Sequence, residues 1–325
     1  MKLAIFGAGM IVKDFLTMIH DLPEIELTAI MGTPKDLPTM EELQKNDGIK
    51  KIYTDAKECL ADPEIDTVYV ALPNFLHYQF SKMALEVGKN VICEKPFTLN
   101  STQLEELNKL AQDKDLILVE AITNQYLSNY RSLKNALPEL GSLKVIECNY
   151  SQYSHRYDAF LEGKILPVFD PKKGGGALMD LNIYNIHFVI GLMGVPKAVH
   201  YYANVTRGID TSGILVLDYP ETKVVCIAAK DCSAQVTSTI QGNKGSIVVD
   251  GPTNVMKDYN EQLNGAESEQ VDKKVHPHRM YEEFKNFNQM IEQHDTKAAS
   301  ERMQHSMIVM NVVDAALKDS GIKLG

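Results

Sequence analysis

A short glycine-rich turn near the start of the chain carries the first pattern that indicates chemistry. Gly7-Ala8-Gly9 follows the apolar run 2–6 and precedes an amphipathic stretch that begins at Ile11. In such a strand–turn–helix unit, the first glycine permits a tight turn and the second lets the backbone approach a pyrophosphate at the helix N-terminus. The third glycine of this fingerprint is replaced by Val12, which should widen the packing of the helix on the strand. We predict dinucleotide binding here, with a plain strand–helix turn as the alternative, through the residues Gly7, Gly9, Met10 and Ile11.

The end of the second predicted strand bears on which dinucleotide is bound. It reads Met31-Gly32-Thr33-Pro34-Lys35, and no carboxylate occurs before Asp36. An NAD site usually has an acidic residue here for the ribose 2′-hydroxyl, whereas Gly32 and Thr33 leave room for a 2′-phosphate that Lys35 could neutralise. We therefore predict NADP in preference to NAD. The alternative for Lys35 is an ordinary solvated loop lysine.

Three further blocks follow one another along the chain. Residues 72–77 read Leu-Pro-Asn-Phe-Leu-His, residues 94–96 read Glu-Lys-Pro, and residues 174–184 read Gly-Gly-Gly-Ala-Leu-Met-Asp-Leu-Asn-Ile-Tyr. In this order they resemble the glucose-fructose oxidoreductase / inositol dehydrogenase (Gfo/Idh/MocA) family. The resemblance covers essentially the whole chain, and the second and third blocks are specific in combination.

The resemblance implies a Rossmann domain followed by an α/β domain with a large open sheet, which often forms the oligomer interface. It places Lys95 beside the nicotinamide and the reacting oxygen, where a cation would stabilise a developing alkoxide and assist proton transfer. A surface lysine at a strand end is the alternative. Pro96 would fix the backbone after Lys95, and a cis peptide bond is one way to do so. The other cofactor contacts implied by these blocks are Leu72, Pro73, Asn74, His77 and Glu94.

The third block supplies the remaining catalytic residues that the resemblance implies. Many family members have Asp-x-x-x-His, whereas this chain has Asp180 and Tyr184, as in the branch with glucose-fructose oxidoreductase and the dimeric dihydrodiol dehydrogenases. Positions i and i+4 share one α-helical face, so both side chains can point at one substrate. A nearby ammonium lowers the pKa of a phenol, which makes Tyr184 with Lys95 the proton-relay pair and Asp180 an orienting residue. A structural Asp–Tyr hydrogen bond is the alternative.

Four residues are weaker candidates for substrate contacts. Gln125 stands where the dihydrodiol branch typically has arginine, and Asn182 replaces a usual glycine of the third block. His187 lies seven residues after Asp180 on the same helical face, with a buried structural histidine as the alternative. His155 follows a predicted strand, and its alternative is a solvated loop.

The elements that must position these residues change in type along the chain. Up to about residue 121, short apolar runs alternate with amphipathic helices, which predicts βαβ units and a parallel sheet with helices on both faces. Beyond it, β-branched and aromatic runs predict a mostly antiparallel sheet, with helices near 177–193, 279–294 and 298–319. Residues 251–275 predict a loop and one uncertain strand. The fold class is therefore α/β, with a dinucleotide-binding Rossmann domain in 1–121 and a substrate-binding and oligomerisation domain in 122–325.

Composition narrows the class of protein further. A chain of 325 residues that is 44% hydrophobic suits two globular domains, and a net charge of -10 disfavours nucleic acid as a partner. Five irregularly spaced cysteines without a CxxC indicate reduced thiols in the cytoplasm, not disulfides or a zinc site. No uninterrupted apolar run is long enough to span a bilayer. We expect a cytoplasmic homo-oligomer, a dimer or tetramer, with a small-molecule substrate and no metal.

Together these patterns predict an NAD(P)-dependent dehydrogenase or reductase. It would transfer a hydride between nicotinamide and a sugar, cyclic polyol or related hydroxyl or carbonyl compound. The alternative is a dinucleotide-binding regulatory protein of the same fold that has no turnover. The presence of Lys95, Asp180 and Tyr184 favours the enzyme.

Overall fold

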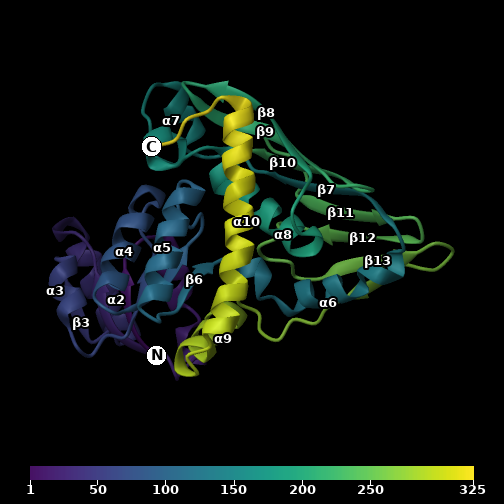
Figure 1. The fold of residues 1–325 in the computed structure, drawn as a ribbon. Coiled ribbons are helices and arrows are strands. Elements are labelled where there is room, and N and C mark those ends of the chain that lie inside the picture. Colours follow the sequence, from purple (N-terminus) through teal and green to yellow (C-terminus); the bar gives the residue numbers. More distant parts are fainter. The chain divides into compact units, whose positions relative to one another are not determined.

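The computed structural model describes residues 1–325, which divide by their contacts into two compact units (Figure 1). The first unit comprises Met1–Ala121 and Met280–Met307, and the second comprises Ile122–Arg279 and Ile308–Gly325. Residues 280–307, which were predicted to belong to the second domain, lie in the first unit. Helix α10 (Thr296–Ser320) consequently contributes residues to both units.

The first unit contains a six-stranded sheet in the order β3-β2-β1-β4-β5-β6, in which every neighbouring pair is parallel. The predicted parallel sheet is confirmed, although β3 was missed. Ligands of such doubly wound sheets bind at the carboxyl ends of the strands where the order reverses, here β1 and β4. The strands are β1 (Lys2–Phe6), β2 (Glu26–Met31), β3 (Lys51–Tyr53), β4 (Thr67–Val70), β5 (Asn90–Glu94) and β6 (Leu118–Ala121).

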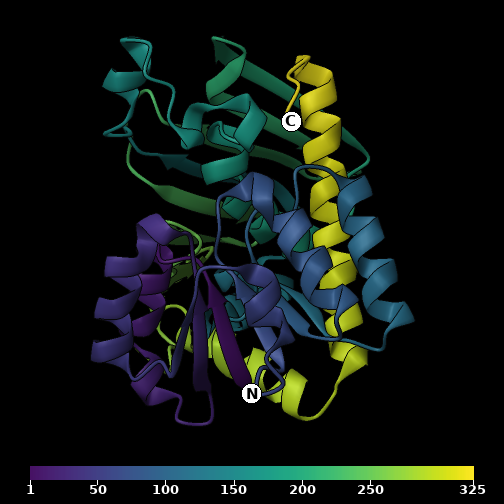
Figure 2. The same ribbon diagram turned by 90° about the vertical axis from the view of Figure 1, so that its left-hand side faces the viewer.

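Helices cover both sides of this sheet (Figure 2). In α5, apolar side chains at Leu104, Leu107 and Ala111 recur at helical spacing and are buried, and the Asn100 side chain caps the first turn by accepting the Gln103 N–H at 3.0 Å. The helices of the unit before residue 121 are α1 (Met10–Leu16), α2 (Leu37–Asp47), α3 (Ala56–Ala61), α4 (His77–Glu86) and α5 (Ser101–Asp113).

Helix α9 (Tyr281–Glu292) joins the first unit through an aromatic cluster. The Phe284 ring lies 4.3 Å from that of Phe15 in α1 and 5.1 Å from that of Tyr69 in β4, measured between centroids. All three rings are buried. Because such contacts add to the burial of apolar area, they explain why a segment late in the sequence packs with the first domain.

Asp62 holds the β3 edge of the sheet. Its carboxylate accepts hydrogen bonds from Lys51 Nζ at 2.8 Å and Tyr53 Oη at 2.9 Å. The bond from Lys51 stabilises the ionised form most, followed by the backbone N–H of Glu64, and together they lower the pKa of Asp62 to about 2. The resulting stabilisation is present above the pKa of the unfolded chain, near about 3.9, and is lost as the pH falls toward 2.

We expect Asp62→Asn to lower the free energy of unfolding at pH 7 by about 1–2 kcal/mol, because the charge-assisted bonds are lost. The difference between wild type and variant should shrink between pH 4 and pH 2. Urea denaturation at pH 7 and pH 3 measures both effects, with Asp113→Asn on the exposed end of α5 as the control. An unchanged difference at the lower pH would contradict the assigned role of the carboxylate.

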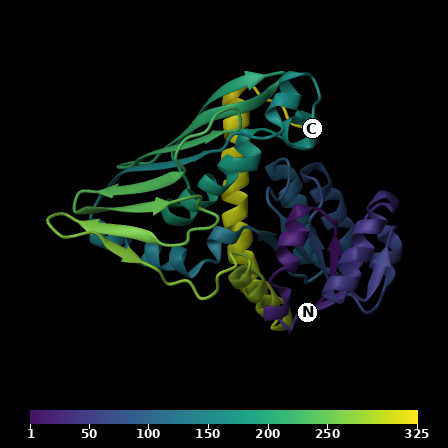
Figure 3. The same cartoon turned by 180° about the vertical axis from the view of Figure 1, so that it is seen from behind.

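The second unit contains an eight-stranded sheet in the order β14-β13-β12-β11-β7-β10-β9-β8 (Figure 3). Only the β7–β10 pair is parallel, which confirms the predicted mostly antiparallel sheet. Residues 251–275 contain two strands, β13 and β14. The strands are β7 (Leu143–Ser151), β8 (Ala198–Thr206), β9 (Ile209–Asp218), β10 (Lys223–Ala229), β11 (Thr237–Gly242), β12 (Gly245–Asp250), β13 (Tyr259–Leu263) and β14 (Glu269–Val271).

The helix predicted over residues 177–193 has two parts. Leu178–Asn182 forms a π-helical turn, and the α-helix α8 (Ile183–Met193) follows it. Hydrogen bonds to the sheet hold both ends of the turn: the Leu178 N–H donates to Asp210, and the Asn182 amide donates to Cys226 O. The prediction of an uninterrupted α-helix was wrong here because these partners lie far away in the sequence. The other helices of this unit are α6 (Ser128–Ala136) and α7 (Tyr157–Leu161).

The segment that contains this helix is long and apolar. Pro171–Met193 is long and apolar enough to cross a membrane by length and composition, but 67% of its most apolar window is buried inside the protein. The Asn185 side chain donates to Ile227 O of β10. These features are those of a core helix packed on a sheet.

Candidate functional site

The glycine turn after β1 is closely packed at its first glycine. The Gly7 N–H donates to Met31 O at 2.8 Å, and Gly7 adopts a φ of 119°. A Cβ at this position would lie 2.4 Å from Ala71 O at the end of β4. Only glycine therefore fits where β1, β2 and β4 meet. Val12, at the place of the missing third glycine, is fully buried.

The second glycine of the turn has open space around it. Gly9 is the N-cap of α1, and no atom lies within 4 Å of the position its Cβ would take. The first N–H groups of a helix have no partner within the helix, and here Lys13 N is the donor that bonds back to Gly9 O, at 3.2 Å. Met10 at the start of the helix is 72% exposed. The turn thus leaves open space in front of a helix N-terminus, which is compatible with the predicted pyrophosphate site.

The loop after β2 is held by its own acidic residue. Asp36 Oδ2 accepts hydrogen bonds from Thr33 N at 2.9 Å and Thr33 Oγ1 at 2.6 Å, which forms a capping box. A Cβ on Gly32 would lie 2.9 Å from Met40 Sδ. Lys35 is exposed on the same loop. The nearest carboxylate is therefore engaged within the loop, and the exposed charge beside it is a cation.

A buried histidine connects the loops that follow β4 and β5. His77 Nδ1 lies 2.8 Å from Pro96 O, and His77 Nε2 lies 2.7 Å from Leu72 O. Burial lowers the pKa of this imidazole below its usual value, although the two backbone carbonyls oppose that effect. Since the ring is fully buried, His77 braces the two loops from beneath. Asn74, from the same predicted block, begins the short turn Asn74–Leu76 that precedes His77, and Pro73 is the N-cap of that turn.

Two carboxylates fix the loop that carries Lys95. Glu94 accepts hydrogen bonds from the Tyr69 hydroxyl at 2.6 Å and from the Lys95 N–H at 3.3 Å, and the Lys95–Pro96 peptide bond is cis. Glu120 accepts the Phe97 N–H at 3.1 Å and the hydroxyl of Ser306 in α10 at 2.6 Å. Both carboxylates are buried. Charge-assisted hydrogen bonds therefore fix the backbone at Lys95, whose side chain is half-buried.

The first-unit candidates lie at one edge of the parallel sheet. Gly7 follows β1, Leu72 follows β4, and Lys95 follows β5, and these three strands are neighbours. Because the carboxyl ends of parallel strands share an edge, the glycine turn and Lys95 occupy the same edge. Local motifs in the sequence identified these residues. The hydrogen bonds from Tyr69 to Glu94 and from Ser306 to Glu120 could not be predicted from such motifs.

Asp180 in the second unit has a partner that the sequence analysis missed. Lys230 Nζ donates to Asp180 Oδ2 at 2.7 Å and to Val168 O at 2.7 Å. The lysine directly follows β10, 50 residues from Asp180 along the chain. Tyr184 is half-buried at the start of α8, with its ring centroid 6.1 Å from that of Tyr150, and its carbonyl accepts the Asn124 amide at 2.9 Å.

A buried acid lies beneath the glycine block. Asp210 accepts the Leu178 N–H at 2.6 Å and the Tyr201 hydroxyl at 2.7 Å. Burial raises the pKa of Asp210, and these two donors oppose the rise. Gly176, with φ of 103°, lies so close that a Cβ would be 2.1 Å from Asp210 Oδ1. This contact explains the need for glycine in the block that precedes Asp180.

The weaker substrate candidates differ in exposure. The Gln125 amide is buried and donates to His187 O at 2.9 Å. Asn182 is fully buried, donates to Cys226 O at 3.1 Å and accepts the Asn185 amide at 3.0 Å. His187 is also fully buried, whereas His155 is exposed on the loop after β7. Gln125 and Asn182 thus use their amides to hold α8 and the π-helical turn in place.

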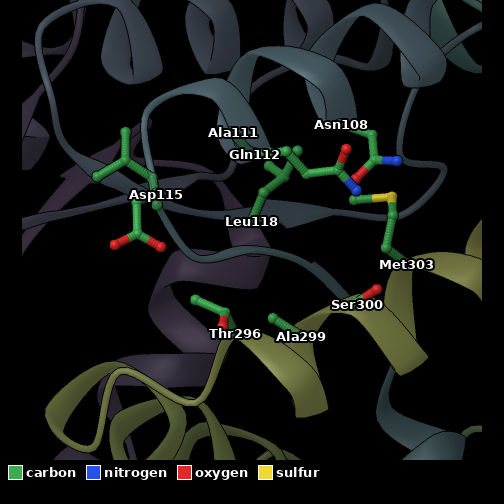
Figure 4. A pocket seen from close by; sticks show the side chains of 10 residues that line it. Asn108, Ala111, Gln112, Asp115, Leu118, Thr296, Ala299, Ser300 and Met303 are labelled. Atoms are coloured by element: carbon green, nitrogen blue, oxygen red, sulfur yellow. The ribbon is translucent and has the colours of Figure 1, made fainter.

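A separate cavity of about 300 Å³ lies between α5 and the first turns of α10 (Figure 4). Its polar lining includes Asn108, Gln112, Thr296 and Ser300. None of the predicted site residues lines it, so it is distinct from the candidate site.

A doubly wound sheet with this glycine turn defines a dinucleotide-binding Rossmann domain, joined here to a domain with a large open sheet. Residues 1–121 match the GFO_IDH_MocA family model, described as an oxidoreductase family with an NAD-binding Rossmann fold, and residues 131–248 match the GFO/IDH/MocA C-terminal domain. The chain belongs to the Gfo/Idh/MocA family.

Several known proteins are similar to this chain over most of their length. The scyllo-inositol 2-dehydrogenase (NADP(+)) IolU of Bacillus subtilis (strain 168) is 29% identical, covering 99% of this chain and 97% of that protein. The uncharacterized oxidoreductase YgjR of Escherichia coli (strain K12) is 30% identical, covering 77% and 76%. The 3-ketoreductase KijD10 of Actinomadura kijaniata, solved with NADP and TDP-benzene, is 18% identical with a TM-score of 0.84, covering 97% and 98%.

Family membership and these relatives support the first of the two functions predicted from the sequence and not the regulatory alternative. The chain is an NAD(P)-dependent oxidoreductase, as predicted. The roles of individual residues stay predictions. The same holds for the functional meaning of Tyr184, which stands where many family members have histidine.

Proposed function

We propose that this enzyme transfers a hydride between NADP and a CH–OH carbon of a cyclic polyol or sugar. The observation that carries the proposal is the placement of Lys95 at the same sheet edge as the Gly7–Gly9 turn. The similarity to an NADP-dependent scyllo-inositol dehydrogenase supports the substrate class. Residues 1–121 would bind the dinucleotide, and residues 122–325 would supply the substrate site and the oligomer interface.

When bound, the nicotinamide would supply or accept the hydride. The chain's own task is to manage the charge and the proton on the substrate oxygen. Lys95 would stabilise negative charge developing on that oxygen, and Tyr184 would hold or give the proton. The braced loop around Lys95 supports this role, since a preorganised cation needs no rearrangement during the reaction. Asp180 would orient a substrate hydroxyl.

The preference for NADP is assigned to the loop after β2. Asp36 is engaged by Thr33, and the exposed Lys35 remains as the charged group next to it. A cation here attracts a 2′-phosphate, and no carboxylate of the loop is left to receive a ribose 2′-hydroxyl. The NADP-bound state of a relative with the same fold supports this assignment.

We expect Lys35→Ala to raise the KM for NADPH about tenfold and to leave the KM for NADH within about twofold, because a charge-assisted contact with the 2′-phosphate is lost. Initial rates with each cofactor measure the change. Lys45→Ala, an exposed lysine in α2, is the matched control. An equal change in the KM values for NADPH and NADH would show that Lys35 does not contact the 2′-phosphate.

The open sheet of the second unit supports the proposed homo-oligomer, a dimer or tetramer. Its strands present an apolar set on one face, in which Tyr202 pairs with Ile214 and Ile214 with Ile227. Tyr202 is 67% and Ile214 is 44% exposed. A covered face would remove this apolar area from water. A cytoplasmic location is proposed from the unpaired cysteines, four of which are buried.

The proposed function is tested by turnover. The enzyme is assayed with NADP⁺ against scyllo-inositol, other inositols and aldoses, and with NADPH against the corresponding ketones, with NAD⁺ and NADH in parallel. We expect turnover of a neutral polyol with NADP⁺ in preference to NAD⁺. NADPH binding without turnover of any compound in the panel would contradict the proposal and favour a regulatory role.

A further inference from the structure

The ion pair at Asp180 joins an accessible carboxylate to an inaccessible ammonium. The Asp180 side chain is 33% exposed, whereas that of Lys230 is only 3% exposed. The two meet at 2.7 Å between Lys230 Nζ and Asp180 Oδ2. A substrate can therefore reach the carboxylate, while the lysine acts only from behind it.

Several contacts hold Lys230 in this position. Its ammonium also donates to Val168 O at 2.7 Å and lies 4.5 Å from the centroid of the Phe169 ring. Its backbone N–H donates to Thr211 O at 2.8 Å, directly after β10. The buried Asp210 lies within its electrostatic reach. These contacts with a carbonyl, an aromatic ring and the sheet hold the Lys230 ammonium in one place, so it also fixes the position of the Asp180 carboxylate.

A buried ammonium at hydrogen-bond distance favours the ionised form of a carboxylate, which accepts hydrogen bonds and cannot donate one. Hydrogen bonds to an ionised acceptor are shorter and stronger than those between neutral groups. Asp180 therefore suits a fixed acceptor for a substrate hydroxyl. The π-helical turn that carries Asp180 is anchored to the sheet by Asn182, so the acceptor is held from its backbone as well.

We infer that Lys230 is a positioning residue that holds Asp180 as a fixed, ionised acceptor for a hydroxyl next to the reacting carbon of a neutral polyol. This inference rests on the proposed function and deepens it. Asp180 then contributes to substrate recognition, and proton transfer is left to Lys95 and Tyr184. An anionic group at that position of a substrate would be repelled by the carboxylate.

The test compares Lys230→Met, Asp180→Asn and the double variant with wild type. The probes are the inositol with the highest kcat/KM in the panel and its deoxy analogue that lacks the hydroxyl next to the reacting carbon. Lys223→Met is the matched control, because Lys223 begins the same strand and pairs with Asp218 at an exposed position. NADPH affinity and thermal melting are measured for every variant.

We expect Lys230→Met to raise the KM for the inositol about tenfold to a hundredfold with kcat reduced less than about fivefold, since a hydrogen bond to a charged acceptor is weakened. The preference for the inositol over its deoxy analogue should fall in proportion. The double variant should be no worse than Asp180→Asn alone, because both changes remove one interaction. NADPH affinity and Lys223→Met should match wild type.

Three outcomes would overturn the inference. In the first, Lys230→Met keeps the wild-type preference for the inositol. In the second, the effects of Lys230→Met and Asp180→Asn add independently in the double variant; if Lys230→Met is poorly folded, an unchanged preference for the inositol in Asp180→Asn decides the matter instead. In the third, wild type turns over no compound of the panel, which overturns the proposed function and the inference with it. Turnover by wild type with either of the first two outcomes overturns the inference alone.

Discussion

Replacing Lys95 with methionine is expected to lower kcat/KM by about a thousandfold while the Kd for NADPH changes less than about threefold. The reason is the position of the ammonium relative to the charge that develops on the substrate oxygen. Methionine keeps the length of the side chain and removes only the cation. The loss should therefore appear in the reaction and not in cofactor binding.

Buried hydrogen bonds hold the loop around Lys95, so a loss of activity in the variant can be assigned to the missing ammonium. Glu94 and Glu120 hold the backbone on both sides of the Lys95–Pro96 bond through Tyr69, the Lys95 N–H, Phe97 and Ser306. Because these bonds join the two carboxylates to backbone N–H groups and hydroxyls, we expect the loop to keep its shape in the variant. Steady-state rates, NADPH fluorescence titration and thermal melting measure the three effects. Lys109→Met, on the exposed surface of α5, is the control.

Retention of more than about a tenth of the wild-type kcat/KM would remove Lys95 from the catalytic role, because general acid–base and electrostatic assistance is worth at least a hundredfold. A parallel loss of NADPH affinity would assign Lys95 to cofactor binding instead. A lower melting temperature with both activities reduced would indicate a structural lysine.

The second large effect is expected at the glycine turn, where the two glycines should behave differently. Gly9→Ala should weaken NADPH binding about a hundredfold, equivalent to about 2.7 kcal/mol, because a methyl group would fill the space through which the pyrophosphate approaches the backbone. Its effect on stability should stay below about 1 kcal/mol. The φ of Gly9 is -79°, and its Cβ would meet no protein atom within 4 Å.

Gly7→Ala is the matched comparison for this prediction. The positive φ of Gly7 and the close approach of Ala71 O mean that an added Cβ strains the turn itself. We expect a loss of stability of about 1–3 kcal/mol, seen as a lower midpoint in urea. Fluorescence titration with NADPH separates the two variants. Wild-type affinity in Gly9→Ala would exclude this turn as the pyrophosphate site.

Features that depend on near neighbours in the chain were accessible from the sequence. The alternation of apolar runs with amphipathic helices predicted the parallel sheet, since helical and strand periods are local properties. Gly7 and Gly9 follow a strand directly, and Lys95 stands in a three-residue motif, so the sequence alone could assign all three residues to a predicted cofactor site. The short β3 was missed because three residues carry too little periodicity.

Features that depend on partners distant in sequence were decided by the tertiary structure. Lys230 reaches Asp180 only because it directly follows β10, the strand to which Asn182 ties the π-helical turn. The same register brings Asp210 under Gly176, directly before the π-helical turn that stands where an α-helix was expected. Residues 280–307 join the first unit through the Phe284 contacts. Strand order and register bring such partners together, and neither can be predicted from a local pattern of residues.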